Sequence, residues 1–267
     1  MKSLTLAFIL LCVTTVSQAQ NYYVATTGNN TNNGSLTAPW KTIQKAVSTV
    51  AAGSTINVRG GTYKEKIDFT KSGNATAGFI TVQNYNGEHV IVDAAGVSGN
   101  GDNVFNLYNK NYVRIKGLEI QNATVPDNHD GAGVFIEGNA DHIEVLNCKI
   151  HDITGDNAMG ITVYGSHKTK AVQNLVIDGN EIYDCEPAHS EALTLNGNVR
   201  LFQITNNIVH DVNNIGIDMI GGEGTCPKAS NDNARNGICS GNTVYNARAI
   251  YGGGYAAGIY VDGGDTI

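Results

Sequence analysis

Three acidic residues in the C-terminal part of the sequence have types and spacing that suit a bound cation. Asp218 closes the segment 213–218, Glu223 lies in the glycine-rich turn 221–224, and Asp262 belongs to the next similar segment. Carboxylates that converge from neighbouring segments are the ligands that hard cations such as Ca²⁺ prefer. The sequence therefore predicts calcium as a candidate cofactor held by these residues. The alternative is that all three are solvated acids on an acidic surface.

Two residues just upstream have side chains that suit proton transfer. Counting back from Leu193 places Glu191 on the inward side of its strand, where loss of hydration would raise its pKa and let it act as an acid. The alternative is that the strand begins later and the loop turns Glu191 outward. His189 lies in the same loop and is a candidate base or metal ligand, with simple solvation as its alternative.

Basic and aromatic candidates complete the set of residues that could do chemistry. Arg235 lies in the long loop before the last repeated strand, from which a base would reach a neighbouring site. Tyr164 and Tyr260 have flat apolar faces on which an apolar surface of a ligand could stack. The alternative interpretation is that Arg235 is solvated and that the two tyrosines pack between coils.

Most of these residues lie in or beside a short pattern, Gly/Ala-aliphatic-x-aliphatic-x-Gly, which occurs five times. Each copy alternates with period two, which predicts a strand with one buried face. The starts are 27, 32, 24 and 42 residues apart, a spacing typical of stacked coils. The copies occupy residues 133–138, 160–165, 192–197, 216–221 and 258–263.

A second pattern between the copies predicts a sharp bend in each coil. It begins at Val113, Ile143, Leu175, Phe202 and Gly237, and its fifth position is always glycine or asparagine. These residues tolerate a positive φ, so the chain can turn there between two short strands. The next position is Asn180, Asn207 and Asn242 in three coils, and we expect these amides to hydrogen-bond to one another as a stack.

Together the two patterns give three strands per coil and predict an all-β fold, a single-stranded right-handed parallel β-helix. The handedness follows the general rule for parallel crossovers. A short α-helix within 39–47 is expected to cap the N-terminal end of the stack. The last residues begin another strand, so we expect the β-helix to be truncated at the C-terminus. The expected core consists of Val134, Ile136, Ile161, Val163, Leu193, Leu195, Ile217, Met219, Ile259 and Val261.

The N-terminal residues 1–19 read as a secretory signal peptide, with Lys2, an apolar run and Ser17-Gln18-Ala19 before the cleavage site. We therefore expect an exported protein, extracellular or periplasmic, whose β-helix domain is 20–267 and which has no membrane span. Export permits disulfides, and Cys226 and Cys239, which bracket a polar loop, are the expected pair. The chain has 24 Asp and Glu against 17 Lys and Arg, which argues against nucleic acid as a partner. We expect a monomer.

These features resemble the right-handed β-helix proteins of the pectate-lyase superfamily. The segments 22–25, 39–46 and 60–63 are similar to the start of secreted polysaccharide lyases of the family-nine kind. The resemblance implies a sugar chain lying along the Gly-bounded strands. One outward column is then Phe135, Thr162, Thr194, Asp218 and Tyr260. A second column is Glu137, Tyr164, Asn196, Ile220 and Asp262. Tyr164, Asn196 and Glu137 of the second column and Tyr260 of the first are the candidate substrate-binding residues.

The resemblance implies β-elimination on an acidic glycan, in which a base removes the C5 proton and the C4 oxygen leaves. Asp218, Glu191, His189 and Arg235 are the catalytic candidates. The Asp-Asp-Gly-x-Asp run of that family is absent from this sequence, which favours a second hypothesis, a non-catalytic glycan-binding or cell-surface β-helix protein. A glycoside hydrolase is a further alternative, since paired carboxyl groups also serve hydrolysis.

Overall fold

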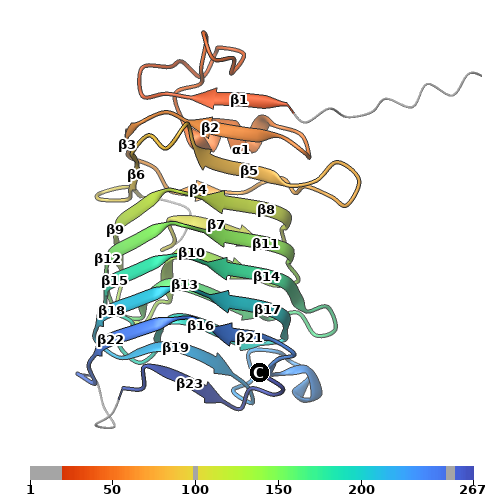
Figure 1. Ribbon diagram of the computed structural model, residues 1–267, viewed down its shortest axis with the longest axis vertical. Coiled ribbons are helices and arrows are strands. Elements are labelled where there is room, and N and C mark those ends of the chain that lie inside the picture. The colour runs from red at the N-terminus through yellow and green to blue at the C-terminus, as the bar shows by residue number, and fades with distance from the viewer. Residues whose placement is uncertain (1–19, 99–101, 251–255) are drawn as a thin grey trace, which may run out of the picture.

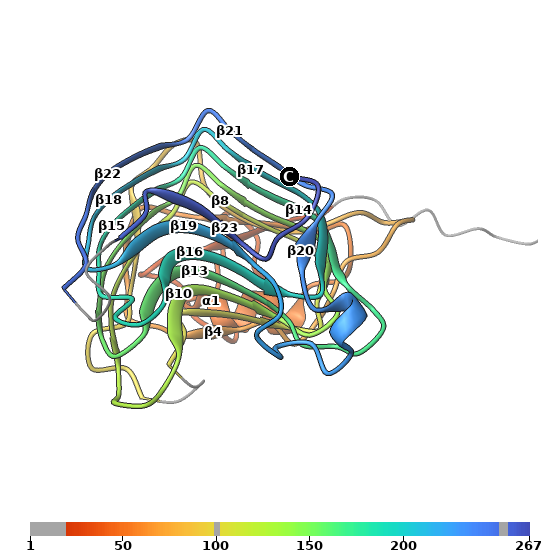
Figure 2. The ribbon, with the colours of Figure 1, turned by 90° about the horizontal axis from the view of Figure 1, so that it is seen from below.

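The computed structural model describes residues 20–98, 102–250 and 256–267, and the expected signal peptide lies outside the described residues. Three parallel sheets run the length of the molecule and form the three sides of a stack of coils (Figure 1). Figure 2, seen along the stack, shows the sheets enclosing a common interior. The predicted all-β architecture of stacked coils is confirmed.

Each sheet takes one strand from each successive coil. The first, sheet A, contains β1 (Asn21–Val24), β2 (Thr55–Val58), β5 (Ile80–Asn84), β8 (Asn111–Lys116), β11 (Asp141–Leu146), β14 (Val172–Asp178), β17 (Val199–Thr205), β20 (Ala234–Arg235) and β21 (Ile238–Ser240). Sheet C contains β3 (Gly61–Tyr63), β6 (Val90–Asp93), β9 (Glu119–Val125), β12 (Lys149–Gly155), β15 (Glu181–Cys185), β18 (Ile208–Val212) and β22 (Thr243–Ala247).

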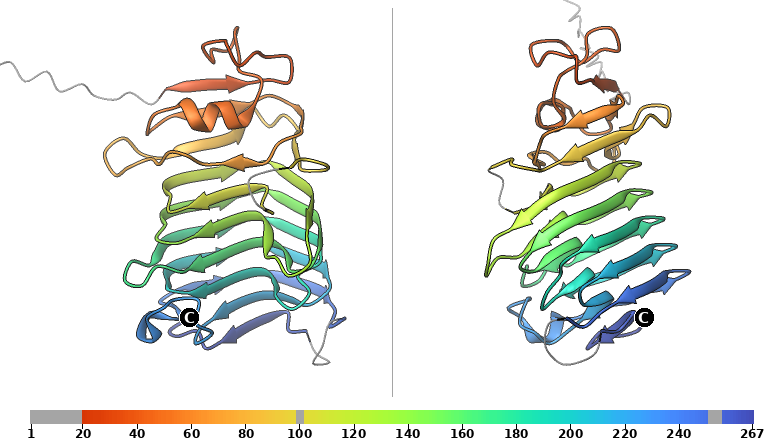
Figure 3. Two further views of the ribbon diagram at one scale, coloured as in Figure 1. Left: turned by 180° about the vertical axis from the view of Figure 1, so that it is seen from behind. Right: turned by 90° about the vertical axis from the view of Figure 1, so that its left-hand side faces the viewer.

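Sheet D carries the five copies of the Gly-bounded pattern. It contains β4 (Ile67–Asp68), β7 (Phe105–Tyr108), β10 (Gly131–Glu137), β13 (Ala158–Gly165), β16 (Glu191–Gly197), β19 (Ile215–Ile220) and β23 (Ile259–Asp262). Every pairing within it is parallel and in register, so equivalent positions of the repeats lie one above another. The left-hand view of Figure 3, from behind, shows the strands of this sheet stacked one above another.

The core is formed by the inward positions of the repeats. Eight of the ten expected core residues are fully buried, and Leu193 and Leu195 are among them. The exceptions are Ile259 and Val261, each 46% exposed, because β23 is the last strand of sheet D in the described part of the chain. An inward side chain is buried only when coils pack on both of its sides. The prediction was therefore wrong for these two positions.

The predicted bend between sheets A and C is confirmed in five coils. Its first residue has a φ between 51° and 67° at Gly117, Asn147, Gly179, Asn206 and Gly241. The asparagine that follows is stacked as expected: Asn180 Nδ2 donates to Asn207 Oδ1 at 2.9 Å, and Asn207 Nδ2 donates to Asn242 Oδ1 at 3.0 Å. The stack satisfies buried amides and fixes the corner at the same place in successive coils.

The N-terminal end contains the one α-helix of the described residues, α1 (Ile43–Thr49), and a 3₁₀ turn, η1 (Ala229–Asn231), lies in a later loop. Thr42 caps α1 by accepting from the amide of Lys45, and the Glu65 carboxylate accepts from the amides of Ile43 and Gln44. Ile43, Ala46 and Val47 face the core, and α1 contacts β4 (Figure 3, left). The predicted capping helix is confirmed.

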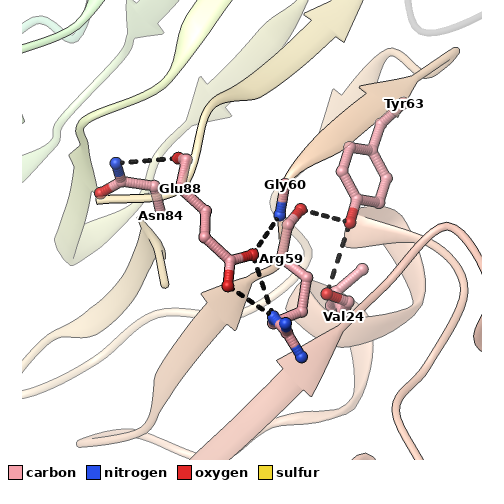
Figure 4. Close-up of polar contacts among 6 residues, drawn as sticks. All are labelled: Val24, Arg59, Gly60, Tyr63, Asn84 and Glu88. Carbon is pink, nitrogen blue, oxygen red and sulfur yellow. Dashed lines mark hydrogen bonds and ion pairs between the residues drawn. The ribbon is translucent and has the colours of Figure 1, made fainter. Parts of the chain in front are cut away.

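Polar contacts join the first coils of the stack (Figure 4). Glu88 accepts from Arg59 Nε at 3.0 Å and from the Gly60 amide at 2.7 Å. These contacts hold the pKa of the Glu88 carboxyl below its usual value. The Tyr63 hydroxyl donates to the carbonyl of Arg59 at 2.8 Å. Arg59 and Glu88 thus each have an opposite charge as a partner, and Glu88 also has the dipole of the Gly60 amide.

The structure corrects the expected disulfide, since all four described cysteines are free thiols. Cys226 Sγ faces the carbonyls of His167 and Lys168 beside the start of β17. Cys239 pairs with Ile204 near the end of β17. Five residues of extended chain separate the two ends of β17, which corresponds to a distance of about 16 Å. A disulfide needs its two Cα atoms within about 7 Å of each other. The polar loop folds back on sheet A and does not close on itself.

No helix in the described part of the chain is long and apolar enough to cross a membrane. The expectation that the stack is incomplete at the C-terminus stays a prediction.

Candidate active site on sheet D

The outer face of sheet D carries the first predicted column in the expected register. Phe135, Thr162, Thr194, Asp218 and Tyr260 are paired from strand to strand. Although they point away from the core, Thr162 and Thr194 are fully buried and Asp218 is only 2% exposed. The column is thus covered by neighbouring side chains, whereas the sequence had suggested a solvent-facing surface.

A small apolar cluster outside the main core provides part of this cover. It contains Ala132, Phe135 and Met159, with Tyr164 packed against them. The rings of Phe135 and Tyr164 meet edge to face, with centroids 5.5 Å apart. The cluster excludes water from this part of the outer face, which lowers the effective dielectric constant around the polar groups beside it.

Glu191 is the first residue of β16 and lies on this outer face. It is 8% exposed, and Ser190 Oγ donates to its Oε2 at 3.2 Å. Burial and the nearby Asp218 carboxyl raise the pKa of Glu191 to about 7. The inward placement was therefore wrong, because Met159 at the equivalent position of β13 also faces the outer cluster. The predicted desolvation is present, but on the other side of the sheet.

Asp218 lies on the neighbouring strand, β19, beside Thr194 of β16. Burial raises its pKa to about 7, and the carboxylates of Asp262 and Glu223 add to the effect. Within the described residues, Asp218 Oδ1 is buried without a hydrogen-bond partner, although backbone hydrogen bonds from Met219 and Asp262 favour the ionised carboxyl and partly offset the effect of burial. A buried polar atom that has no partner costs about 1–3 kcal/mol, so a bound molecule that hydrogen-bonds to Asp218 Oδ1 would relieve this cost.

We call Glu191, Asp218, Glu223 and Asp262 the carboxyl cluster. Glu223 is exposed and accepts from Asn196 Nδ2 at 2.9 Å. Asp262 is exposed at the end of β23. Among the described residues, no three His, Cys, Asp or Glu side chains converge closely enough to hold a metal ion. The donors have the hard oxygens that calcium prefers, but they do not form a coordination shell in this structure.

Three of the four candidate substrate-binding residues lie in the second column, and Tyr260 lies in the first. Glu137 pairs with Tyr164, and Tyr164 pairs with Asn196. Glu137 accepts from Ser166 Oγ at 3.0 Å. Tyr260 lies beside Asp218 in the first column. The structure thus brings these four residues to the same outer face as the carboxyl cluster.

The other two catalytic candidates differ in their placement. His189 is exposed in the loop before Glu191, where its backbone amide donates to Asn157 Oδ1. Arg235 lies in β20 of sheet A, beside Arg200, and its guanidinium donates to Asn198, Asn231 and Asn233. His189 therefore borders the carboxyl cluster, whereas Arg235 is turned toward another face and is not placed as a base there.

Asp130 and Thr194 are site residues that the sequence reasoning missed. Asp130 Oδ2 accepts from the Tyr164 hydroxyl at 3.2 Å, and its Oδ1 accepts from Asn157. With burial, the Asp130 carboxylate raises the pKa of Tyr164. Asp130 lies in a loop outside both repeated patterns, so only a three-dimensional structure could join it to Tyr164. Thr194 was visible as a column member but has no charge to single it out.

Comparison with known proteins supports this architecture. The family model described as "Pel9A-like, right handed beta helix region" matches residues 22–198, more than half of the chain. The protein therefore belongs to the Pel9A-like right-handed β-helix family, and the predicted handedness and family resemblance are confirmed.

Two curated relatives are similar in sequence. The uncharacterized protein YwoF of Bacillus subtilis (strain 168) is 37% identical over 257 residues, which cover 92% of this chain and 54% of that protein. Pectate lyase PEL9 of Emericella nidulans is 42% identical over 83 residues, which cover 30% of this chain and 20% of that protein. The chain spans about half the length of the first relative and a fifth of the second.

Solved structures share the fold at low sequence identity. Pectate lyase Pel9A has a TM-score of 0.51 at 20% identity, over 90% of this chain and 58% of that chain. A GH136 lacto-N-biosidase from Eubacterium ramulus has a TM-score of 0.62 at 16% identity, over 75% of this chain and 43% of that chain. A rhamnogalacturonan lyase has a TM-score of 0.58 at 15% identity, over 93% of this chain and 63% of that chain. Lyases and a hydrolase thus share this β-helix, so the fold alone does not decide the reaction.

Proposed function

We propose that this protein is an exported carbohydrate-active enzyme that cleaves an acidic polysaccharide by β-elimination on the outer face of sheet D. The observation that carries the proposal is the pair of buried carboxyl groups, Glu191 and Asp218, whose pKa values are both raised to about 7. Perturbed carboxyl groups that are buried together are typical of active sites. The Pel9A-like family and the pectate lyase relative support a polysaccharide substrate.

The raised pKa values explain how an acidic site can accept an acidic sugar. Near neutral pH these carboxyl groups hold protons for part of the time, so they can donate hydrogen bonds to a uronate carboxylate. Asp218 Oδ1, which has no partner among the described residues, is the natural donor. A carboxylic acid kept neutral by an apolar setting stabilises developing negative charge in this way.

The remaining steps of the elimination need a base and an acid. His189 is the proposed base that takes the proton from C5, as its loop borders the carboxyl cluster. The electron pair left at C5 forms the C4–C5 double bond, and the C4–O bond breaks. Protonated Glu191 supplies the proton to the leaving oxygen. Tyr164 and Tyr260, with Asn196 and Glu137, are proposed to position the sugar rings.

Calcium remains a proposal that this mechanism does not use. When bound, a calcium ion would help neutralise the uronate carboxylate. Asp218, Glu223 and Asp262 would have to move together to hold it, because the described acids do not converge. Activity measured with added Ca²⁺ and after treatment with a chelator tests this separately from the elimination itself.

Hydrolysis is a second candidate, favoured by the coupling between the two carboxyl groups. The ionised form of Asp218 raises the pKa of Glu191, so one proton is held by the pair over a range of pH. One protonated and one ionised carboxyl is the arrangement that glycoside hydrolases use.

One experiment separates these functions. The protein is incubated with polygalacturonate, rhamnogalacturonan, alginate and chondroitin, and both ultraviolet absorbance and new reducing ends are followed. Elimination raises both signals together, because each cut creates one double bond and one reducing end. Reducing ends alone would identify a hydrolase. If neither signal appears while the glycan binds, the proposal fails and the non-catalytic hypothesis holds.

A further inference from the structure

A second polar surface lies on the outer face of sheet A, away from the carboxyl cluster. The first outward position of successive strands forms a column in register, which reads Asn111, Asp141, Gln173, Arg200 and Arg235. These side chains, with Lys170, line a cavity of about 520 Å³. Two arginines and a lysine thus gather on a chain that has an excess of acids.

Both guanidinium groups are held in place by neutral partners. Arg200 donates from Nε and Nη2 to Gln173 Oε1, at 2.8 Å and 2.5 Å. Arg235 donates from Nη1 to the carbonyl of Asn233 at 2.9 Å and from Nη2 to Asn198 Oδ1 at 2.9 Å. The rotamers are fixed, but no negative charge is bound. In the described part of the chain, no carboxylate forms an ion pair with either arginine.

The acids near this column do not neutralise the arginines. Asp141 lines the same cavity, but its carboxylate already accepts from Gln173 and Asn174 and pairs with His142. The backbone of Asp265 bridges that of Arg235 on the other side, without an ion pair between their side chains. The Asp141 carboxylate keeps its charge and offsets only one of the three positive charges that line the cavity, so a net positive charge remains.

The register places the two arginines as direct neighbours on adjacent strands, about 4.8 Å apart along the stack. Like charges directly opposite each other are destabilising. Burial, together with repulsion by Arg200, lowers the pKa of Arg235. A bound anion would relieve this repulsion, and the fork of a guanidinium matches the two oxygens of a carboxylate.

We propose that Arg200, Arg235 and Lys170 form a carboxylate-binding subsite for an acidic glycan, separate from the carboxyl cluster. Free inorganic anions offer similar oxygens, so the same cavity would attract phosphate. The arrangement as a column along the stack favours a polymer, because the coils present polar side chains at regular intervals. The subsite would hold a part of the glycan that does not react. Its existence does not depend on whether the protein cleaves that glycan.

Titration calorimetry at low salt tests the subsite. Trigalacturonate is titrated into the full chain carrying Asp218→Asn, which prevents turnover at sheet D if the proposed function is right. We expect binding in this background. Adding Arg200→Gln, at an exposed residue whose guanidinium donates to Gln173, should weaken it about tenfold or more. Raising the salt concentration should weaken the binding as well.

Arg114→Gln in the same background is the matched control, because Arg114 lies on the outer face of sheet A but is already paired with Glu144. It should leave the affinity for trigalacturonate unchanged. Maltotriose, which has no carboxylate, should not bind at this site. If Arg200→Gln binds like its parent, or if phosphate binds as tightly as trigalacturonate, the subsite proposal is overturned. If the single variant Asp218→Asn does not bind trigalacturonate, the glycan binds on sheet D, and the proposal of a subsite on sheet A is also overturned.

Discussion

The acids at the two ends of the stack differ in what surrounds them. Glu88 in the first coils meets the Arg59 guanidinium and the Gly60 amide, and its pKa is lowered. Asp218, near the other end, is buried beside further carboxyl groups, and its pKa is raised to about 7. Hydrogen bonds and an opposite charge favour the ionised form of Glu88, whereas burial and nearby like charges disfavour the ionised form of Asp218.

This difference separates groups that hold the fold from groups that suit a reaction. A paired acid such as Glu88 favours the folded state, although an exposed pair contributes little. Glu191 and Asp218 instead make the folded state less stable when they ionise. Local conflicts of this kind are expected at functional sites, where stability is given up for chemistry.

The largest expected effect is on activity. If the carboxyl cluster is catalytic, Glu191→Gln and Asp218→Asn should each lower the cleavage rate about 100-fold or more, the contribution typical of acid–base groups. Asp152→Asn is the matched control, since Asp152 is an exposed acid on sheet C. Rates are measured on the substrate that the glycan panel identifies. Wild-type rates in both cluster variants would remove the distinction between the two regions.

A core substitution should sharpen the comparison between buried and end positions of one column. Leu195→Ala should cost about 2–5 kcal/mol of unfolding free energy, because coils pack on both sides of Leu195. Val261→Ala should cost well under half of that, as Val261 is 46% exposed. Urea unfolding of the two variants measures both values. Equal losses would contradict the register of sheet D.

The pH dependence of stability should show the cost of the carboxyl cluster. Asp218 keeps its proton in the folded protein up to about pH 7, but loses it near pH 4 when the chain is unfolded. Its contribution is therefore present at low pH and lost as the pH rises from about 4 to 7. Asp218→Asn, which cannot ionise, should be more stable than wild type at pH 8 by on the order of 3 kcal/mol, with little difference at pH 4. Thermal melts at both pH values test this. A variant that is less stable at pH 8 would show that Asp218 is not destabilising when ionised.

The smallest effect is expected at Glu88, and it should have the opposite sign. The lowered pKa means that the ion pair with Arg59 stabilises the protein above the unfolded pKa and is lost as the pH falls through the folded value. Glu88→Gln should therefore destabilise the protein slightly at pH 8, by about 1 kcal/mol or less. The same melts measure it, with high salt as the control. A clear gain in stability at pH 8 would contradict the ion pair drawn in Figure 4.

The fold was predictable because its signals are local and repeated. Asn180, Asn207 and Asn242 each follow a residue that tolerates positive φ, and the repeat alone placed them one above another, as the structure confirms. The site was harder to predict. Strict alternation predicts the inner face for Glu191, and a loop that turns it outward is the alternative; in the structure β16 begins with Glu191 on the outer face beside Met159. Alternation fails where a strand leaves a loop, and the sequence does not mark that point.

The sequence by itself determined the stack: three short strands per coil, a tight bend, a capping helix and one buried face per strand. Period-two patterns and bend residues act over a few positions, so they can be read from the chain. Only the tertiary structure decided which polar groups are desolvated, which acids have partners, and that Cys226 and Cys239 lie at opposite ends of β17. Those properties depend on loops of different length brought together across coils. No local pattern encodes how such loops cover one another.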